Sequence, residues 1–463
     1  MNENEKKFPP IWLACFVLIG FLMLAFGFTV KDISIQLAIF AGWFLAIFAG
    51  KYMGYKYSEL QKAATEGINK GMDAILILLA VGMLVGTWIS GGIVPSIIYY
   101  GLKVIHPSVF LLATLIICAI TSLCTGTSWG TAGTAGIAMM GIGAGLGVPA
   151  PITAGAVLSG AYFGDKLSPL SDSCILSSSM AGVELIRHIK GLMPVSISGF
   201  IATAIAFTFM GFKVVHGNAD LGQIQFVMSS IDEIFNISLI NLLPLVIVIG
   251  LLVMRMPSIP VLCLGAVIGI LWGIIFQGLD PISAIQTAWA QIPQNTGLDF
   301  IDNILSRGGM SSMLGSVAVI ILGLGFGGLL GKVGILTVIS NLIERLIIGA
   351  TSLTAVTIVV AFFGNLFGSA MYVSLILTPQ IMARKYDEMG YDRRVLSRNS
   401  EVGGTLTSGM VPWSDNGIYM AALLGVPVLQ YVPYMWLSFF CIGFSILFAA
   451  LNMFMWKVEP KAE

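Results

Sequence analysis

The stretch from Gly160 to Ser173 reads GAYFGDKLSPLSDS and places two carboxylates and an ammonium inside otherwise apolar sequence. Charged side chains at membrane depth are unfavourable by on the order of several kcal/mol and usually face a transport pathway. Pro169 removes one helix donor and frees a carbonyl. Because apolar segments flank the stretch closely, it predicts a membrane-crossing helix at 151–184 that is interrupted near its middle. The alternative is a short polar loop at the surface.

The charged residues of this stretch are expected to divide their roles. Asp165 and Lys166 are neighbours that could offset each other, which would leave Asp172 as the freer carboxylate. A free carboxylate can bind either Na⁺ or H⁺, but not both at once. That competition is the simplest chemistry of an antiporter, so Asp172 is the predicted centre of the ion site.

The composition around this stretch places the whole chain in a membrane. Of its 463 residues, 57% are hydrophobic and only 10% are charged, whereas a soluble domain carries about 25% charged residues. The mean hydropathy is +0.93. The formal net charge is +0 and no basic face is present, so no nucleic-acid partner is expected.

The same sequence excludes several classes of function. The six cysteines form no CxxC pair and the three histidines show no metal-ligand spacing, so neither a structural zinc site nor any other cofactor is expected. A GxxxxGK[ST] phosphate-binding motif is absent, which disfavours ATP-driven transport. No catalytic constellation appears, and the chain is not expected to be an enzyme.

Uncharged runs of about 20 residues, enough to cross a bilayer as a helix, recur along the chain. Complete crossings fit at 11–30, 33–50, 72–91, 189–212, 236–254, 258–276, 312–331 and 433–456. With the N-terminus in the cytoplasm, 18 cationic residues fall inside and four outside, as the positive-inside rule requires. Adding two interrupted crossings gives ten, with both termini cytoplasmic and the protein in the cell membrane.

The segment from Thr125 to Gly136 reads TGTSWGTAGTAG and lies within an uncharged stretch at 107–164. Glycines permit non-helical turns, and hydroxyls compete for backbone hydrogen bonds. A helix is therefore expected to open here, within a re-entrant hairpin at 107–150. Thr127 and Ser128 would supply hard oxygen ligands for Na⁺, together with Asp172. The alternative is a small-residue packing motif of the GxxxG kind.

A second copy of both features occurs near the C-terminus. Pro169 to Ser173 (PLSDS) matches Pro412 to Asn416 (PWSDN), 243 positions later (415 − 172), and Thr127-Ser128 lies near Gly368-Ser369, 241 positions later. The second copy predicts a hairpin at 350–384 and an interrupted crossing at 401–426. Its candidate site residues are Asn365, Ser369, Ser414 and Asp415; the alternative is that this copy is an inherited scaffold.

These features predict an all-α polytopic membrane protein made of two inverted repeats, each with a re-entrant hairpin and a discontinuous helix. The repeats would occupy 1–235 and 236–463. Each holds an odd number of predicted crossings, so the second must be inverted relative to the first. Inverted repeats with discontinuous helices are a recurrent plan of secondary transporters.

GTSWGTAGTAG followed by GAYFGDKLSPLSDS resembles the NhaC-type sodium/proton antiporters of the ion-transporter superfamily. The resemblance implies Na⁺ extrusion in exchange for H⁺, and a homodimer. The residues that match the family's motif here are Thr127, Ser128, Asp165, Ser168, Ser171 and Asp172. The family also includes transporters that swap malate and protons for lactate and Na⁺, which is the alternative function. A passive channel and an amino-acid or drug exporter are weaker alternatives.

Overall fold

The computed structural model describes residues 8–31, 33–69, 71–218, 221–254, 256–290 and 308–458. Lys6, Lys7, Lys70, Arg255, Arg307 and Lys461, which contribute to the predicted orientation, lie outside these ranges. Within them the chain is helical apart from turns and one isolated bridge between Tyr391 and Lys457.

The helices of the first half are α1 (Ile11–Val30), α2 (Ile35–Tyr52), α3 (Tyr57–Asn69), α4 (Met72–Ser90), α5 (Ile93–Val104), α6 (Phe110–Thr125), α7 (Ser128–Thr131), the π-helix η2 (Ala132–Gly136), α8 (Ile137–Gly145), α9 (Ala150–Asp165), α10 (Asp172–Ala181), α11 (Leu185–Asn218) and α12 (Leu221–Ile234). Those of the second half are α13 (Leu243–Val253), α14 (Ser258–Gln277), α15 (Pro281–Trp289), α17 (Leu314–Val333), α18 (Ile335–Glu344), α19 (Ala350–Gly368), α20 (Met371–Glu388), α21 (Arg393–Ser408), α22 (Asp415–Leu424), α23 (Val428–Tyr431) and α24 (Trp436–Ala450).

Among the described residues, seven helices are long and apolar enough to cross a membrane, or up to ten if each sharply bent pair is one span. The ten predicted crossings match the upper number, but the two sets differ. The helices at 107–125 and 350–368, predicted as hairpin arms, are long enough to span. The predicted crossing at 433–456 is instead the shorter α24, and that at 72–91 continues into α5 after a 69° bend.

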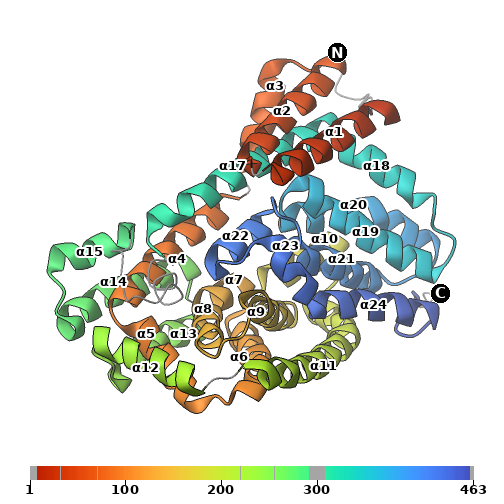
Figure 1. Ribbon diagram of the computed structural model, residues 1–463. Coiled ribbons are helices and arrows are strands. Elements are labelled where there is room, and N and C mark those ends of the chain that lie inside the picture. Colours follow the sequence, from red (N-terminus) through yellow and green to blue (C-terminus); the bar gives the residue numbers. More distant parts are fainter. Residues whose placement is uncertain are drawn as a thin grey trace.

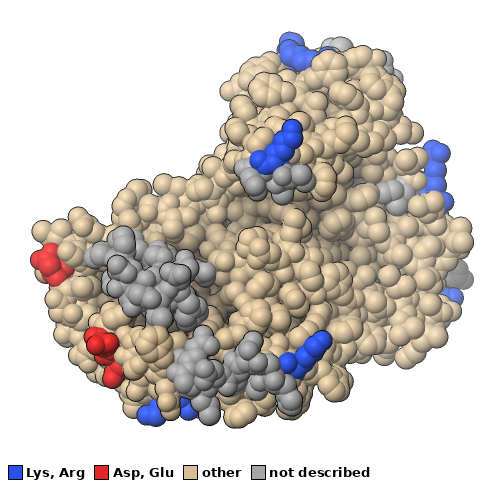
Figure 2. All heavy atoms as spheres, viewed as in Figure 1, with Lys and Arg blue, Asp and Glu red and all other residues tan. Residues whose placement is uncertain are grey.

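The surface of the molecule is suited to lipid. Phe44, Phe209 and Ile275 are each more than half exposed, although water would oppose such exposure of large apolar side chains. Figure 2 shows one face of the molecule on which few charged residues are visible. These features establish a multi-pass membrane protein.

Two sets of helices recur at a constant interval. α9 and α21 begin at 150 and 393 and end at 165 and 408, and α10 and α22 begin at 172 and 415 and end at 181 and 424. Every one of these pairs differs by 243 (for example 408 − 165). Figure 1 shows the two sets, in yellow and blue, gathered at the centre of the molecule, where α10 packs against α20 and α21.

The helices outside this centre pack reciprocally between the halves. α4 of the first half packs on α14 and α15 of the second, while α17 of the second packs on α2 and α3 of the first. Glycines permit the close approach: a Cβ on Gly86 would lie 2.3 Å from the Thr287 carbonyl oxygen, and one on Gly67 would lie 2.4 Å from that of Leu324. Small residues bring membrane helices together in this way.

Candidate functional site

Four interruptions of the central helices bring polar groups into the interior. We call the turn between α6 and α7 the first tip (125–128) and that between α19 and α20 the second tip (368–371). The first break (165–172) runs from the last residue of α9 to the first of α10, and the second break (408–415) runs from the last residue of α21 to the first of α22. Helix ends leave backbone donors and acceptors unpaired, and at membrane depth such groups are tolerated only within protein or along a cavity.

The two tips have the same backbone path. Gly126 and Ser369 are left-handed, with φ of 72° and 57°, and the following residues, Thr127 and Ala370, are extended. Gly126 and Ser369 are also 243 positions apart (369 − 126), so the predicted correspondence at 241 is wrong by two residues. Thr127 and Ser128 correspond to Ala370 and Met371.

The first tip packs directly against the first break. A Cβ on Gly126 would lie only 2.6 Å from the Leu170 Cβ, so glycine is required here for space as well as for its φ. The Ser128 backbone N–H donates to Asp165 Oδ2 at 3.2 Å. Thr127 uses its hydroxyl to accept from the Gly130 N–H at 3.3 Å, which caps the helix that follows.

Asp165 is the buried carboxylate of the first break, with 3% of its surface exposed. Ser171 Oγ donates to Asp165 Oδ1 at 2.6 Å. The predicted offset by Lys166 is not observed among the described ion pairs: Lys166 is also buried, and its Nζ donates to Cys441 Sγ at 3.3 Å. Ser168 Oγ accepts from the Leu170 N–H at 3.3 Å and thereby shapes the break.

Asp172 is exposed at the start of α10. Its carboxylate accepts from the Tyr372 hydroxyl and, at 3.0 Å, from the Ser173 N–H. Asp172 is thus the more accessible of the two carboxylates, whereas Asp165 is the one in contact with the first tip. The structure brings Ser128, Asp165 and Ser171 into direct contact, with Asp172 adjacent to Ser171 in the chain.

The second tip is joined to the second break by hydrogen bonds from two backbone N–H groups. The Asp415 N–H donates to the Ser369 carbonyl at 2.9 Å, and the Met371 N–H donates to Asp415 Oδ1 at 3.2 Å. Ser414 caps α22 by accepting from the Gly417 N–H at 3.0 Å. Asn365 Nδ2 donates to the Gly404 carbonyl at 2.6 Å. Asn365, Ser369, Ser414 and Asp415 therefore belong to one group.

Several oxygens near the tips are buried and have no hydrogen-bond partner within the described residues. They are Thr125 Oγ1, Thr131 Oγ1, Asn365 Oδ1 and Ser369 Oγ. Leaving such groups unpaired is unfavourable by about 1–3 kcal/mol each. Hydroxyl and amide oxygens of this kind are suitable ligands for a dehydrated hard cation.

Directly after each tip, an aromatic residue reaches the helix that follows the opposite break. Trp129 Nε1 donates to Asn416 Oδ1, and its ring stacks on Tyr419 at 4.2 Å between centroids. In the mirrored arrangement Tyr372 donates to Asp172. Trp129 and Tyr372 are again 243 positions apart (372 − 129). Sequence reasoning missed both, although their shared position in the two copies was a usable signal.

Glu401 is a further buried carboxylate that was not selected from the sequence. It lies on α21 with no exposed surface, and Oε1 accepts from Ser173 Oγ at 2.8 Å and from Thr405 Oγ1 at 2.7 Å. The predicted crossing at 401–426 begins too late, because α21 starts at Arg393 and buries Glu401 within its length. An acidic residue between apolar and small residues was the available signal.

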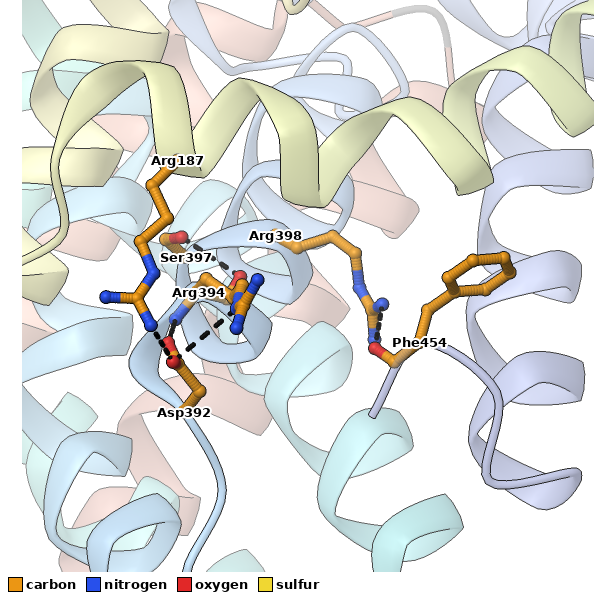
Figure 3. Close-up of polar contacts among 6 residues, drawn as sticks. All are labelled: Arg187, Asp392, Arg394, Ser397, Arg398 and Phe454. Carbon is orange, nitrogen blue, oxygen red and sulfur yellow. Dashed lines mark hydrogen bonds and ion pairs between the residues drawn. The ribbon is translucent and has the colours of Figure 1, made fainter. Parts of the chain in front are cut away.

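A polar cluster fixes the beginning of α21, as Figure 3 shows. Asp392 caps the helix by accepting from the Arg394 N–H at 2.9 Å, and its carboxylate also pairs with Arg187 of α11. Arg398, predicted in a cytoplasmic segment, is completely buried and donates to the Phe454 carbonyl at 2.9 Å. The cluster holds the helix that carries Glu401 against α11 and the C-terminal segment.

A helical membrane bundle with discontinuous helices and carboxylates at the interruptions is the architecture of a secondary transporter. The sequence matches the model of the Na⁺/H⁺ antiporter family over residues 6–212 and 160–453. The chain belongs to this family and is a transporter rather than an enzyme.

Among curated relatives, the malate-2H⁺/Na⁺-lactate antiporter of Bacillus subtilis is 54% identical, with 98% of each chain covered. The Na⁺/H⁺ antiporter NhaC of Alkalihalophilus pseudofirmus is 34% identical, with 90% of each chain covered. Among solved structures, Neisseria gonorrhoeae MtrF, of a class of antimetabolite efflux pumps, aligns with a TM-score of 0.42 and 14% identity over 86% of this chain and 84% of its own.

Proposed function

We propose that this protein is an organic-acid antiporter that exchanges malate and protons for lactate and Na⁺ across the cytoplasmic membrane. The observation that carries the proposal is the 54% identity, over 98% of both chains, to an antiporter with that activity. The sequence alone favoured plain Na⁺/H⁺ exchange and held this function as the alternative. The much lower identity to the NhaC protein, 34%, supports reversing that order.

Sodium is proposed to bind between the first tip and the first break. Asp172 would supply the charge, and the hydroxyls of Thr127 and Ser128 would replace water around the ion. Asp172 is accessible at the start of α10, and the Ser128 N–H contacts Asp165 within the same break. A cation that leaves water needs such oxygens around it, because an unpaired charge in an apolar medium is very unfavourable.

The carboxylate substrate is proposed to bind beside the second tip. Ser369 Oγ is buried without a partner there, and a hydroxyl can donate to a carboxylate. The N–H groups of Asp415, Asn416 and Gly417 at the start of α22 are already bonded to the Ser369 carbonyl, Asp415 Oδ1 and Ser414 Oγ, so the Ser369 hydroxyl is the donor proposed for the carboxylate. Asn365, Ser414 and Asp415 would shape this second part of the site. This second part of the site would hold a different solute from the first part. The absence of a counterpart of Lys166 from the second copy accords with that difference.

The repeats are proposed to run in opposite directions through the membrane, with the division near residue 235. The constant interval of 243 between corresponding helices supports two repeats, and the reciprocal packing of α4 and α17 supports an interlocked pair. Rocking of one repeat against the other would open the site alternately to each side, as in other inverted-repeat transporters.

The test is transport by the purified chain in proteoliposomes that contain a pH-sensitive dye. Vesicles loaded with Na⁺ and lactate should take up labelled malate and become acidic inside only when both internal solutes are present. Na⁺-dependent proton movement that ignores malate and lactate would instead assign the chain to plain Na⁺/H⁺ exchange. Flux that does not saturate with ion concentration would indicate a channel.

A further inference from the structure

A continuous chain of side-chain contacts connects the two halves of the molecule through its interior. Asp165 Oδ1 lies 2.6 Å from Ser171 Oγ, Ser171 Oγ lies 3.0 Å from Ser173 Oγ, and Ser173 Oγ lies 2.8 Å from Glu401 Oε1. All four residues are at most 3% exposed. The chain therefore joins a carboxyl of the first break to a carboxyl of α21 without passing through bulk solvent.

The number of protons available decides whether all three of these contacts can be hydrogen bonds. Three contacts link four groups, and each contact requires one proton to be a hydrogen bond. The two serine hydroxyls supply two protons, so the third must come from one of the carboxyls. With both carboxyls ionised, Ser171 donates to Asp165 and Ser173 donates to Glu401, and the contact between the serines holds no proton. The chain is complete only when the pair of carboxyls carries one proton.

The single proton can rest at either end. When Asp165 is protonated, it donates to Ser171, Ser171 donates to Ser173, and Ser173 donates to ionised Glu401. A shift of one proton across each contact moves the carboxyl proton to Glu401 and leaves Asp165 ionised. Three O–H bonds break and three form, so the net change is the transfer of one proton from Asp165 to Glu401.

The surroundings of Glu401 support its role as the receiving group. Oε2 is buried and has no hydrogen-bond partner within the described residues, which disfavours the ionised form. The other titratable groups around these contacts are Asp172, Lys166 and Cys174, then His188 and Tyr386, which contact the preceding turn of α21, and Cys441, which Lys166 contacts.

We propose that Glu401 is a proton-carrying residue of the transport cycle, and that Ser171 and Ser173 pass the proton between Asp165 and Glu401. The proposal deepens and rests on the proposed function, in which protons accompany the organic acid. Protonation at Asp165 would then oppose Na⁺ binding at neighbouring Asp172, because it removes negative charge from the same break. Glu401, in the other half, would hold the proton while Na⁺ binds.

The test uses full-length protein in proteoliposomes and two modes of transport. The first mode is proton-coupled exchange, followed by a pH-sensitive dye. The second is exchange of ²²Na⁺ against unlabelled Na⁺ with equal lactate and equal pH on both sides, which moves no net protons. Glu401→Gln should reduce the first mode by about a hundredfold, since it removes a proton-transfer group. It should leave the second within about twofold, the range of substitutions that do not disturb structure.

Ser173 allows the path to be tested without changing any charge. Ser173→Ala should reduce proton-coupled exchange by about tenfold or more and spare sodium exchange, and Ser173→Thr should restore the loss because it returns a hydroxyl. The matched control is Ser178→Ala, a buried serine of the same helix whose hydroxyl donates only locally, to the Ile175 carbonyl at 3.0 Å. It should leave both modes unchanged.

The proposal is overturned if Glu401→Gln retains proton-coupled exchange at the wild-type rate, or if Ser173→Ala reduces both modes equally. Failure of the proposed function looks different. Wild-type protein that moves neither malate nor lactate would refute the organic-acid assignment, yet the same variants would still report on Glu401 through Na⁺-driven proton movement.

Discussion

Asp165 and Asp172 stand in one short stretch of sequence but in two different environments. Asp165 is buried against the first tip, where a backbone N–H and the Ser171 hydroxyl hold its two oxygens. Asp172 is exposed and contacts the other half through Tyr372. A buried carboxyl without a cation favours a proton, whereas an accessible carboxylate can exchange a hydrated ion. The two residues are thereby suited to different ions.

Replacing Asp172 tests the proposed sodium charge. Asp172→Asn should abolish Na⁺-dependent proton movement, because an amide has no net charge to offer Na⁺. The exposed position should keep the change in folding stability within about 0.5 kcal/mol, so the protein should still insert and purify. Asp232→Asn, an exposed substitution on α12, is the control. Retention of most of the wild-type exchange would remove Asp172 from the ion site.

Substitutions of the two hydroxyl residues of the first tip distinguish a role in ion binding from a role in helix capping. Ser128→Ala keeps the N–H that contacts Asp165 and removes only the hydroxyl, so it should raise the Na⁺ KM with little change in thermal stability. The loss of affinity should be on the order of 1–3 kcal/mol. Thr127→Ala also removes the cap on Gly130 and should lower stability by about 1 kcal/mol. Wild-type KM in both variants would move the search to Asn365 and Ser369.

At the scale of elements, the two tips adopt one backbone path with different residues. Position 126 is glycine and its counterpart, position 369, is serine, and both are left-handed. A left-handed conformation is unfavourable for a residue with a side chain. The structure around Ser369 must compensate for this strain, and its buried, unpartnered hydroxyl indicates that the side chain is retained for a purpose other than packing.

Substitutions at these two positions should behave oppositely. Gly126→Val adds a branched side chain at φ 72°, where even a Cβ would lie 2.6 Å from Leu170, so it should prevent normal folding. Ser369→Gly relieves strain and should preserve or raise stability by about 0.5–1 kcal/mol. Malate transport by Ser369→Gly should nevertheless fall. Thermal unfolding in detergent and transport rates check both, and full malate transport by Ser369→Gly would exclude its hydroxyl from the substrate site.

The cluster in Figure 3 makes a prediction about α21. Asp392→Ala removes the N-cap and the partner of Arg187, so stability should fall by about 1–2 kcal/mol. Asp387→Ala breaks a comparable pair with Arg393, 2.6 Å long, in which both side chains are nearly half exposed, and serves as the control. Equal thermal stability of the two variants would show that the cap does not anchor α21.

The first break was predictable from sequence because its cause is local. Proline, glycine and three charges within Gly160 to Ser173 locate the end of α9 and the start of α10. The start of α21 was not predictable, because a segment rich in arginine looks like a cytoplasmic loop. Arg398 can be buried because distant groups accept its hydrogen bonds, among them the Phe454 carbonyl, 56 positions away. The contact between Glu401 and Ser173 spans 228 positions and leaves no local signal in the sequence either.

At the scale of the whole molecule, the site exists only because the halves interlock. The first tip contacts α22 through Trp129 and Asn416, the second tip contacts α10 through Tyr372, and α10 contacts α21 through Ser173 and Glu401. A movement of one repeat relative to the other must alter these contacts together. The proposed ion binding at the first break would therefore change the geometry of the second, which is what coupled exchange requires.

The pH dependence of sodium affinity tests this coupling. If Na⁺ and H⁺ compete for the carboxyls of the first break, protonation removes the binding form, and the apparent Na⁺ KM should rise as pH falls. Once the proton is bound in most molecules, each unit decrease in pH should raise KM by up to about tenfold, because binding that requires deprotonation loses that factor. The measurement is Na⁺-dependent exchange in proteoliposomes between about pH 6 and 9, a range that spans the physiological titration region. Asp172→Glu, which keeps a carboxyl, should preserve the slope. A KM that does not change across this range would mean that Na⁺ and protons occupy separate sites, and coupling would then have to arise wholly from the movement of the repeats.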